Sequence, residues 1–344
     1  MHVLVTGGTG MLGGHLVRRL AERGDRVRAV DLRQPASPQP GTEYLVGDVR
    51  DGDLMARAAA GVDAVVHCAA ALPSYPDAEI RSVIVGGTRT VLGACQRAGV
   101  GHVVHISSTA VYGLPDRVPT TEDAPIAPVD TYSTAKAAAE EVCQRYRADG
   151  QLLTVLRPKT FVGPGRLGLF SMLFEWADDG HHFPVLGRGD VRIQMLAIDD
   201  LLDGVLLALA AAPAAAGGTY NLGATEFGTL REDFQAVLDA AGHGKRVIRL
   251  PAAPALAVLR LLGRTGLSPV YGRLLSKLTA DSYVSVERAR DQLGFTPRYS
   301  NQDAVLRTFA WWRAERTAGR LAGPGRTSRD AWRQGALGWA KALF

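Results

Sequence analysis

A glycine-rich turn near the amino terminus limits most strongly how this chain can fold. It follows the β-branched run Val3–Val5 and leads into an amphipathic stretch that predicts a helix. Gly7, Gly10 and Gly13 stand three residues apart. The run also contains Gly8, which completes a Gly-x-Gly-x-x-Gly pattern. Glycine lets the backbone approach a pyrophosphate, and a helix N-terminus offers unpaired N–H groups. The turn predicts a dinucleotide site built from Gly7, Gly10, Met11, Leu12 and Gly13.

The first 160 residues alternate apolar runs with helical stretches. Strands are predicted at 3–5, 27–30, 44–46, 64–66, 103–106 and 152–156, and helices at 12–23, 53–60, 80–98 and 131–148. Continuous apolar strands joined by helices favour a parallel sheet covered on both faces. We therefore expect an α/β fold, a doubly wound parallel Rossmann-type sheet with a smaller, mostly helical C-terminal substrate lobe.

The pattern becomes irregular after residue 160. Turns are predicted at 163–165 and 187–189, helices at 199–211 and 229–241, and a strand at 219–222. We expect residues 1–160 to bind the cofactor, with segments of 190–225 returning to that domain. Residues 161–314 would form the substrate-binding lobe, and 315–344 a basic tail that could form a separate helix.

Composition excludes several classes of protein. The 344 residues are 47% hydrophobic and 21% charged, as in a globule with a sizeable core. The net charge of +5 comes without a basic cluster interleaved with aromatics, so we expect no nucleic-acid partner. The cysteines and histidines lack metal-ligand spacing, so no metal is expected. We expect no signal peptide, and no apolar run reaches about 18 residues, which favours a cytoplasmic location.

The ends of the next strands predict how the rest of the cofactor is held. Asp31 ends the second strand, where a carboxylate accepts both ribose hydroxyls and favours NAD. Arg33 could instead reach the 2′-phosphate of NADP. Asp48 could accept from the adenine amino group, or it could be a solvated turn residue. The remaining residues predicted at this surface are Val49, Ala69, Ala70 and Ala71.

Tyr132 and Lys136 have the spacing of a proton-handling pair. At positions i and i+4 of a helix they share a face. A tyrosine pKa of about 10 is too high for ready proton exchange near neutrality, and a nearby ammonium favours the phenolate. Lys136 could also hold the nicotinamide ribose. Such a pair alone is more often simply exposed to solvent on a helix. The neighbouring sequence therefore decides whether Tyr132 and Lys136 are interpreted as catalytic.

Those surroundings resemble the extended short-chain dehydrogenase/reductase family, the group of NAD-dependent epimerases and dehydratases. The resemblance covers roughly residues 2–314. It rests on the ordered segments 106–113, 156–158, 162–165, 198–200, 220–223 and 293–297. It implies that Tyr132 is the general acid/base, that Lys136 is its electrostatic partner, and that Ser108 hydrogen-bonds the reacting oxygen. Pro158 would border the nicotinamide, and the protein would be a homodimer.

Two positions narrow the reaction that the resemblance implies. Dehydratases of the family carry Asp-Glu just before Val-Tyr-Gly, and decarboxylating relatives carry Glu there. This chain has Thr109 and Ala110, and alanine cannot transfer a proton. Either 4-epimerisation through a transient ketone or net alcohol/ketone oxidoreduction remains.

The expected substrate contacts depart from the family pattern. The family's asparagine two residues after Arg-Pro is Thr160 here, Ile84 replaces another asparagine, and Arg192 is displaced by one residue. Lys159, Arg166 and Arg192 could clamp an anion or be ordinary surface charges. The predicted substrate-binding set is Ser108, Thr109, Thr160, Arg166 and Arg192.

The leading interpretation is a nucleotide-sugar 4-epimerase. The alternative is an NAD(P)-dependent dehydrogenase or ketoreductase for a more hydrophobic alcohol or ketone, as in the sterol-dehydrogenase branch. The Leu- and Ala-rich stretch 254–278 would favour the alternative if it lined an apolar cavity or touched a membrane, but it would equally suit a packed lobe helix. Membrane-surface contact by the tail is less favoured than docking or disorder. A non-catalytic scaffold is the third class, against which the Ser108, Tyr132 and Lys136 set argues.

Overall fold

The computed structural model describes residues 1–168, 170–251, 254, 280–321 and 341. Most of the apolar stretch 254–278, and most of the tail including Trp332 and Trp339, lie outside the described residues. Lys341 is described, and its ammonium contacts Glu175 of the lobe at 2.9 Å.

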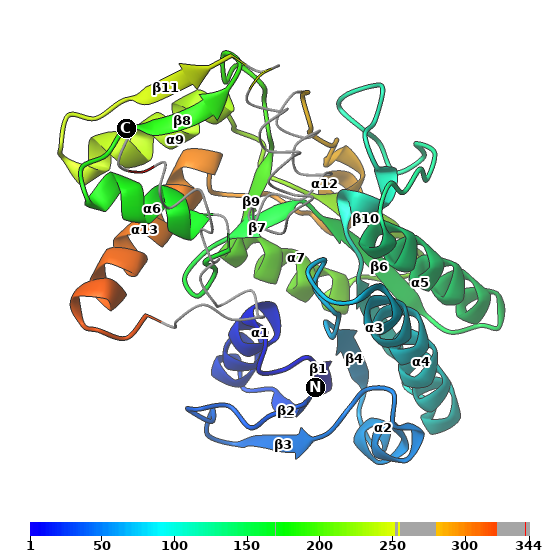
Figure 1. Cartoon of the computed structure of the whole chain (residues 1–344). Helices are drawn as coiled ribbons and strands as arrows, with labels where there is room; N and C mark the ends of the chain where they lie inside the picture. The colour runs from blue at the N-terminus through cyan, green and yellow to red at the C-terminus, as the bar shows by residue number, and fades with distance from the viewer. Residues whose placement is uncertain (169, 252–253, 255–279, 322–340, 342–344) are drawn as a thin grey trace.

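A seven-stranded parallel sheet forms the centre of the molecule (Figure 1). Its order is β10-β6-β5-β4-β1-β2-β3, and every neighbouring pair is parallel. The strands are β1 (His2–Thr6), β2 (Arg26–Asp31), β3 (Thr42–Val46), β4 (Ala64–His67), β5 (His102–Ile106), β6 (Leu153–Pro158) and β10 (Thr219–Leu222). The order reverses between β1 and β4, and ligands of open α/β sheets bind at such a switch point. The expected Rossmann-type sheet is confirmed.

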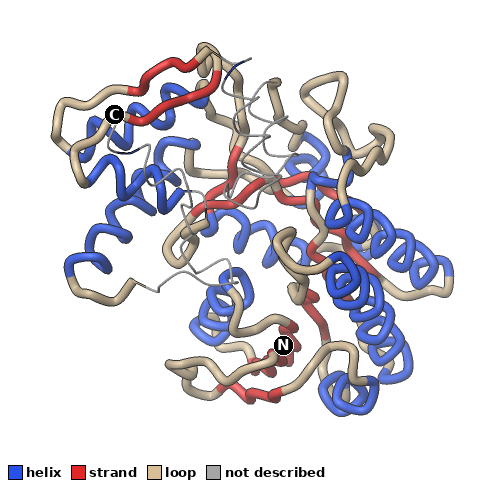
Figure 2. Tube along the Cα trace, in the orientation of Figure 1, coloured by secondary structure: helices blue, strands red, loops and turns tan. Residues whose placement is uncertain are grey.

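Helices cover both faces of this sheet, as the tube in Figure 2 also shows. On one face, α1 (Met11–Glu22), α7 (Ile198–Ala210) and α12 (Glu287–Leu293) bury leucines against β1, β4, β5 and β6. On the other face, α2 (Gly52–Ala59), α4 (Gly87–Ala98) and α5 (Thr131–Ala148) pack on the same strands. Apolar burial stabilises such layers by roughly 25 cal/mol per Å². Both β10 and α7 follow residue 190 in the chain. β10 is thus a strand of the sheet, and α7 is part of the helix layer that covers it.

The helix expected over residues 80–98 is longer and interrupted. It starts as α3 (Asp77–Arg81), passes through the π-helical turn η1 (Ser82–Gly86) and continues as α4. The Thr88 hydroxyl donates to the Ile84 carbonyl at 2.6 Å, and such side-chain bonds compete with the helical ladder. A Cβ on Gly87 would lie 2.9 Å from Cγ2 of Val49, so glycine here lets the helix lie close to the loop after β3 without displacing that side chain.

The lobe is smaller than the sheet domain and contains more strand than expected. Its helices are α6 (Phe170–Asp178), α9 (Leu230–Ala241) and α13 (Asn301–Thr317), and they share an aromatic core. Two parallel pairs accompany them: β7 (Thr160–Val162) with β9 (Met195–Ala197), and β8 (Phe183–Leu186) with β11 (Val247–Leu250). The short helix α8 (Pro213–Ala216) precedes β10. These strands are too short for a clear period-two pattern in the sequence.

Capping boxes fix where three helices begin. Asp130 caps α5 together with Ser133, Thr229 caps α9 with Glu232, and the same reciprocal bonds join Ser300 to Asp303 before α13. Each box satisfies backbone N–H groups that would otherwise lack partners. The start of α5 matters most, because that helix carries the expected proton-handling pair.

A buried ion pair ties α5 to the end of the sheet. The Arg157 guanidinium of β6 contacts the Glu140 carboxylate at 2.5 Å, and the side chains are 6% and 7% exposed. Burial opposes the charge on Arg157, but the hydrogen bonds and attraction from Glu140 outweigh it and raise the pKa of the guanidinium. Arg157 also donates to the Tyr112 hydroxyl at 2.7 Å, which in turn donates to Asn221 of β10 at 2.8 Å.

Replacing Glu140 by alanine is expected to destabilise the fold by about 3–5 kcal/mol, because Arg157 would keep its charge in a buried place without its carboxylate. The neighbouring Glu141 is exposed, so Glu141→Ala should change stability by less than about 0.5 kcal/mol. Urea unfolding of the two variants measures both values. Equal effects would show that the pair does not hold the helix in place.

Candidate active site

The glycine turn closes tightly between β1 and α1. The N–H groups of Gly7 and Gly8 donate to the Val30 carbonyl at 2.8 and 3.2 Å, which joins the turn to the end of β2. Gly7 has φ of 69°, in the left-handed region that favours glycine. A Cβ on Gly13 would lie 2.0 Å from the Gly7 carbonyl oxygen. No side chain larger than hydrogen fits there, so the backbone forms a cradle over the start of α1.

The helix N-terminus at this cradle has no side-chain cap. Gly10 is the N-cap, and glycine has no side chain that could cap the first turn. Met11 and Leu12 are buried there, so their side chains serve the core while their backbone faces the turn. Such a helix end suits a phosphate. The geometry fits the pyrophosphate of a dinucleotide, as the glycine spacing predicts.

Asp31 lies beside the same turn. Its carboxylate accepts from the Thr9 N–H at 3.0 Å and from the Leu32 N–H at 2.7 Å. These bonds fix the carboxylate at the end of β2, where it can accept from ribose hydroxyls. Arg33 is exposed two residues further on. This placement agrees with a preference for NAD.

Asp48 has a partner that the sequence reasoning missed. Arg50 donates to it through Nε at 2.9 Å and Nη2 at 2.5 Å, and this bonding lowers the pKa of Asp48. If Asp48 accepts a hydrogen bond from the adenine amino group, its carboxylate would do so while it is also bonded to Arg50. Val49 is buried, and Ala69 meets the glycine turn, because a Cβ on Gly7 would touch its backbone at 3.0 Å. Ala71 is buried with Ile80 and Ile84, and Ala70, between Ala69 and Ala71, is exposed.

The structure brings the proton-handling residues to the carboxyl end of β5. The Lys136 ammonium donates to the Ile106 carbonyl at 2.8 Å, and Ser108 follows two residues later as the N-cap of the short 3-10 helix η2 (Thr109–Tyr112). The half-buried Tyr132 packs in the cluster that contains Ala71. Ser108 is likewise half-buried, and its hydroxyl accepts from the Ala110 N–H at 3.1 Å.

Lys136 is a strongly perturbed base at the site. It is 3% exposed, and burial lowers the pKa of its ammonium to about 8, despite attraction from Cys68 and Glu140. Perturbed pKa values are typical of functional sites. An ammonium placed behind a tyrosine on the same helix face stabilises the phenolate.

A layer of buried polar groups beneath Lys136 escaped the sequence reasoning. His67 bonds Thr6 at 2.7 Å and Thr88 at 3.1 Å, and burial, together with Lys136, lowers its pKa to about 3. The ring of His105 lies 5.3 Å from that of His67. Both histidines are therefore neutral supports. Their only signal in the sequence is a histidine inside each of two otherwise apolar strands.

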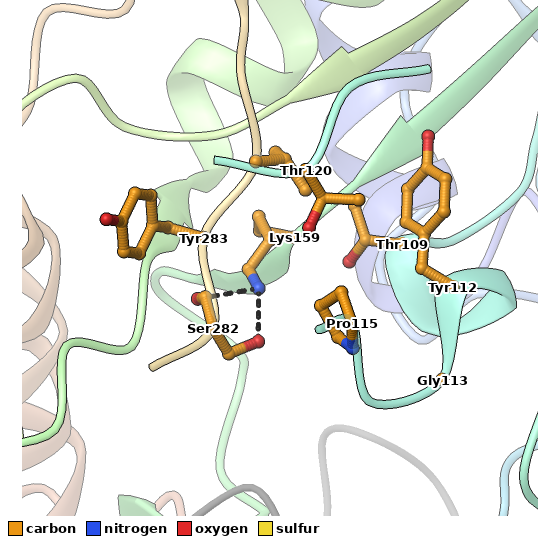
Figure 3. A pocket seen from close by; sticks show the side chains of 9 residues that line it. Thr109, Tyr112, Gly113, Pro115, Thr120, Lys159, Ser282 and Tyr283 are labelled. Carbon is orange, nitrogen blue, oxygen red and sulfur yellow. Dashed lines mark hydrogen bonds between the residues drawn. The ribbon is translucent and has the colours of Figure 1, made fainter. Parts of the chain in front are cut away.

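A small pocket opens beside Thr109 on the substrate side of the site (Figure 3). The residues that line it are Thr109, Tyr112, Gly113, Pro115, Thr120, Lys159, Ser282, Tyr283 and Val284. Thr109 donates to the Pro158 carbonyl at 3.4 Å, so the pocket adjoins the residue expected to border the nicotinamide. Pro158 itself is buried at the end of β6.

The other expected substrate residues do not gather in this pocket. Thr160 is exposed at the start of β7. The Arg166 guanidinium lies over the Phe161 ring, 4.7 Å from its centroid. Arg192 is held by Asp281 at 3.0 Å and by the Tyr283 hydroxyl at 2.9 Å. An arginine already bound to a carboxylate is less able to clamp a diphosphate.

Comparison with known proteins agrees with this geometry. The model of the NAD dependent epimerase/dehydratase family matches residues 3–223. The chain belongs to this family. It is accordingly an NAD-dependent enzyme of the extended short-chain dehydrogenase/reductase type, and the cradle described above fits that cofactor.

Individual relatives span most of the chain. A protein of Sinorhizobium fredii, y4nG, is 35% identical over 92% of this chain and 79% of its own length. A 3 beta-hydroxysteroid dehydrogenase/Delta 5-->4-isomerase of Mycobacterium tuberculosis is 32% identical over 92% of this chain and 94% of its own. The solved UDP-glucose 4-epimerase of Thermotoga maritima, with UDP-glucose, shares the fold with a TM-score of 0.77 at 23% identity, covering 91% of this chain and 99% of that one.

The described ranges lack two kinds of feature. No group of three or more histidine, cysteine, aspartate or glutamate residues there is arranged to hold a metal ion. None of the helices in the same part of the chain has the length and apolarity needed to cross a bilayer.

The depressed pKa of Lys136 predicts how stability depends on pH. Between about 8 and 10.5 the unfolded lysine holds a proton that the folded one has lost, so stability rises with pH across this window. Lys136→Met removes that term. Between pH 7.5 and pH 10.5, the free energy of unfolding of the original protein should rise by up to about 3 kcal/mol relative to that of the variant.

Urea unfolding of both proteins at several pH values measures this difference. Lys245→Met, which changes a lysine of the lobe, serves as the control and should track the original protein. A stability difference between Lys136→Met and the original protein that does not change with pH would contradict the burial-induced shift.

Proposed function

We propose that this protein oxidises and reduces a secondary alcohol and its ketone at the site formed by Ser108, Tyr132 and Lys136. The observation that carries the proposal is the Lys136–Ile106 bond of 2.8 Å. It holds the Tyr132 face of α5 against the end of β5, from which Ser108 emerges. In the sheet, β4 separates β5 from β1, the strand that leads into the glycine cradle. NAD would supply the hydride acceptor at its nicotinamide ring.

The cofactor would be held by groups at the ends of β1, β2, β3, β4 and β6 and by one side chain of α5. The cradle of Gly7, Gly10 and Gly13, with the backbone of Met11 and Leu12, would take the pyrophosphate, and Asp31 the adenosine ribose. Lys136 would hold the nicotinamide ribose, and Pro158 would border its ring. Asp48, Val49 and Ala69–Ala71 would line the remaining surface. We further propose residues 1–160 as the cofactor domain and 161–314 as the substrate lobe.

The chain's own part in the reaction is to hold and move one proton. Ser108 would donate a hydrogen bond to the reacting oxygen. Tyr132 would take the hydroxyl proton on oxidation and return it on reduction, since the Lys136 ammonium favours the phenolate. Thr109 and Ala110 offer no carboxyl group. Ala110 is buried, and the Thr109 hydroxyl donates to a backbone carbonyl, which speaks against a dehydration step at these positions.

The leading candidate reaction is 4-epimerisation of a nucleotide sugar. It needs only the hydride step and the Tyr132 proton, in both directions, at one carbon. The family description and the shared fold of a UDP-glucose 4-epimerase support it. Homodimer formation and a cytoplasmic location stay predictions from the sequence.

The second candidate is net oxidoreduction of a more hydrophobic alcohol or ketone. The relative named as a hydroxysteroid dehydrogenase favours it. The pairing of Arg192 with Asp281 favours it as well, because a nucleotide sugar would bring a diphosphate that needs a cation. The two candidates use the same catalytic residues and differ in what happens to the reduced cofactor.

Tyr132→Phe should lower turnover by about 10²- to 10⁴-fold, since the proton carrier is lost while the packing of the ring is kept. NAD binding, measured by calorimetry, should stay within about threefold. Tyr146→Phe removes a hydroxyl from the far end of the same helix and should leave turnover unchanged. Full activity in the Tyr132 variant would refute the proposed role.

The fate of the cofactor separates the two candidates. An epimerase regenerates its oxidant in every cycle, so protein purified without added cofactor should release about one NAD(H) per chain on denaturation. A net dehydrogenase must exchange its cofactor and should release little. Absorbance and enzymatic cycling of the supernatant measure the ratio, and little released cofactor would count against epimerisation.

A further inference from the structure

Lys159 places a positive charge inside the substrate pocket. Its ammonium donates to the backbone carbonyl and to the hydroxyl of Ser282, each at 2.9 Å, as Figure 3 shows. Its own N–H donates to the Leu222 carbonyl at 2.8 Å, which fixes the backbone beside β10. With 5% of the residue exposed, the cation is held in one place rather than carried on a mobile side chain.

The remaining walls of the pocket are neutral and rich in hydroxyl groups. Among the nine described residues that line it, Lys159 carries the sole formal charge. Thr109, Thr120 and Ser282 each carry a hydroxyl, whereas the Tyr283 phenol points away from Lys159 and accepts from Arg192 at 2.9 Å. The Thr109 and Thr120 hydroxyls donate to the backbone carbonyls of Pro158 and Arg117. The buried ammonium is therefore the group that favours an oxyanion, because attraction between charges is stronger where water is excluded.

The position of the pocket limits which oxyanion can enter. Thr109 follows Ser108, the residue proposed to contact the reacting oxygen, and Lys159 follows Pro158. A group in this pocket therefore lies close to the reacting carbon. In a nucleotide hexose the diphosphate is attached at C1, across the ring from C4. In a nucleotide uronic acid the carboxylate is attached to C5, which is the ring carbon next to C4. In a 3-hydroxy acid the carboxylate is likewise near the carbinol.

We propose that this pocket binds a substrate carboxylate and that Lys159 selects for it. The inference rests on the proposed function, since it uses the assigned position of the reacting carbon. It makes the substrate an acid, such as a nucleotide uronic acid or a 3-hydroxy acid. Lys159 is then a specificity residue of the same site.

Binding to the NAD-saturated Tyr132→Phe protein tests this without requiring turnover. Two ligand pairs differ mainly in the carboxylate: UDP-glucuronate against UDP-glucose, and 3-hydroxydecanoate against 3-decanol. Calorimetry should show that the acid binds about 10- to 100-fold more tightly than its neutral partner in at least one pair. Adding Lys159→Met should reduce that preference to less than about threefold.

Control variants separate the charge from the packing. Lys159→Arg keeps a cation and should keep a preference for the acid. Arg188→Met removes a guanidinium from an exposed turn and should leave the preference for the acid unchanged. Lys159→Met should fold, because the Ser282 carbonyl also accepts from the Gln194 N–H at 3.1 Å and stays bonded. The thermal midpoint and NAD affinity verify this.

Three results would overturn the inference. The first is the absence of any preference for the acid in both pairs. The second is a preference that survives unchanged in folded Lys159→Met. The third is an equal loss of affinity for both UDP sugars, which would mean that Lys159 binds the diphosphate. None of these coincides with failure of the proposed function, which would appear as undiminished turnover of the Tyr132→Phe protein.

Discussion

The buried pair of Glu140 and Arg157 is the interaction on which the catalytic end of this molecule depends. It joins α5 to β6, and through Tyr112 and Asn221 it reaches η2 and β10. Ser107 adds a hydrogen bond from β5 to the same carboxylate. Two charges removed from water are tolerated only where their geometry and additional hydrogen bonds compensate for the lost hydration. That requirement fixes the relative positions of the elements that carry the site.

The same constraint explains the placement of the proton-handling residues. Tyr132, Lys136 and Glu140 follow one another at intervals of four along α5, so one face of the helix presents them in a row. Glu140 is anchored by Arg157, and Lys136 is anchored by the Ile106 carbonyl. With two of the three side chains fixed, the third can only lie near the end of β5. Tyr132 is thus positioned in part by the Glu140–Arg157 pair, which would itself take no part in the proposed reaction.

Much of the fold and of the candidate cofactor site could be predicted from the sequence, because both depend on patterns of a few neighbouring residues. Apolar strands, helical periods and the glycine turn each span a few residues, and α5 begins and ends where its sequence indicates. The supporting network could not be predicted, because Glu140, Arg157 and Asn221 are distant in the chain and only the fold brings them together. The same holds for the pairing of Arg192 with Asp281, 89 residues away. The pocket beside Thr109 combines five residues of the segment 109–120 with Lys159 and residues 282–284, so no local pattern predicts its composition.

The wall formed by Ser282–Val284 is held by hydrogen bonds to two separate segments. Thr120 and Tyr283 are joined on one side, and Gln194 bonds Val284 on the other. None of these bonds involves α5 or the glycine cradle. Changes in this wall can therefore alter which molecule is accepted while the reaction itself stays the same. Such separation of recognition from chemistry would let one ancestral scaffold give rise to enzymes for very different substrates.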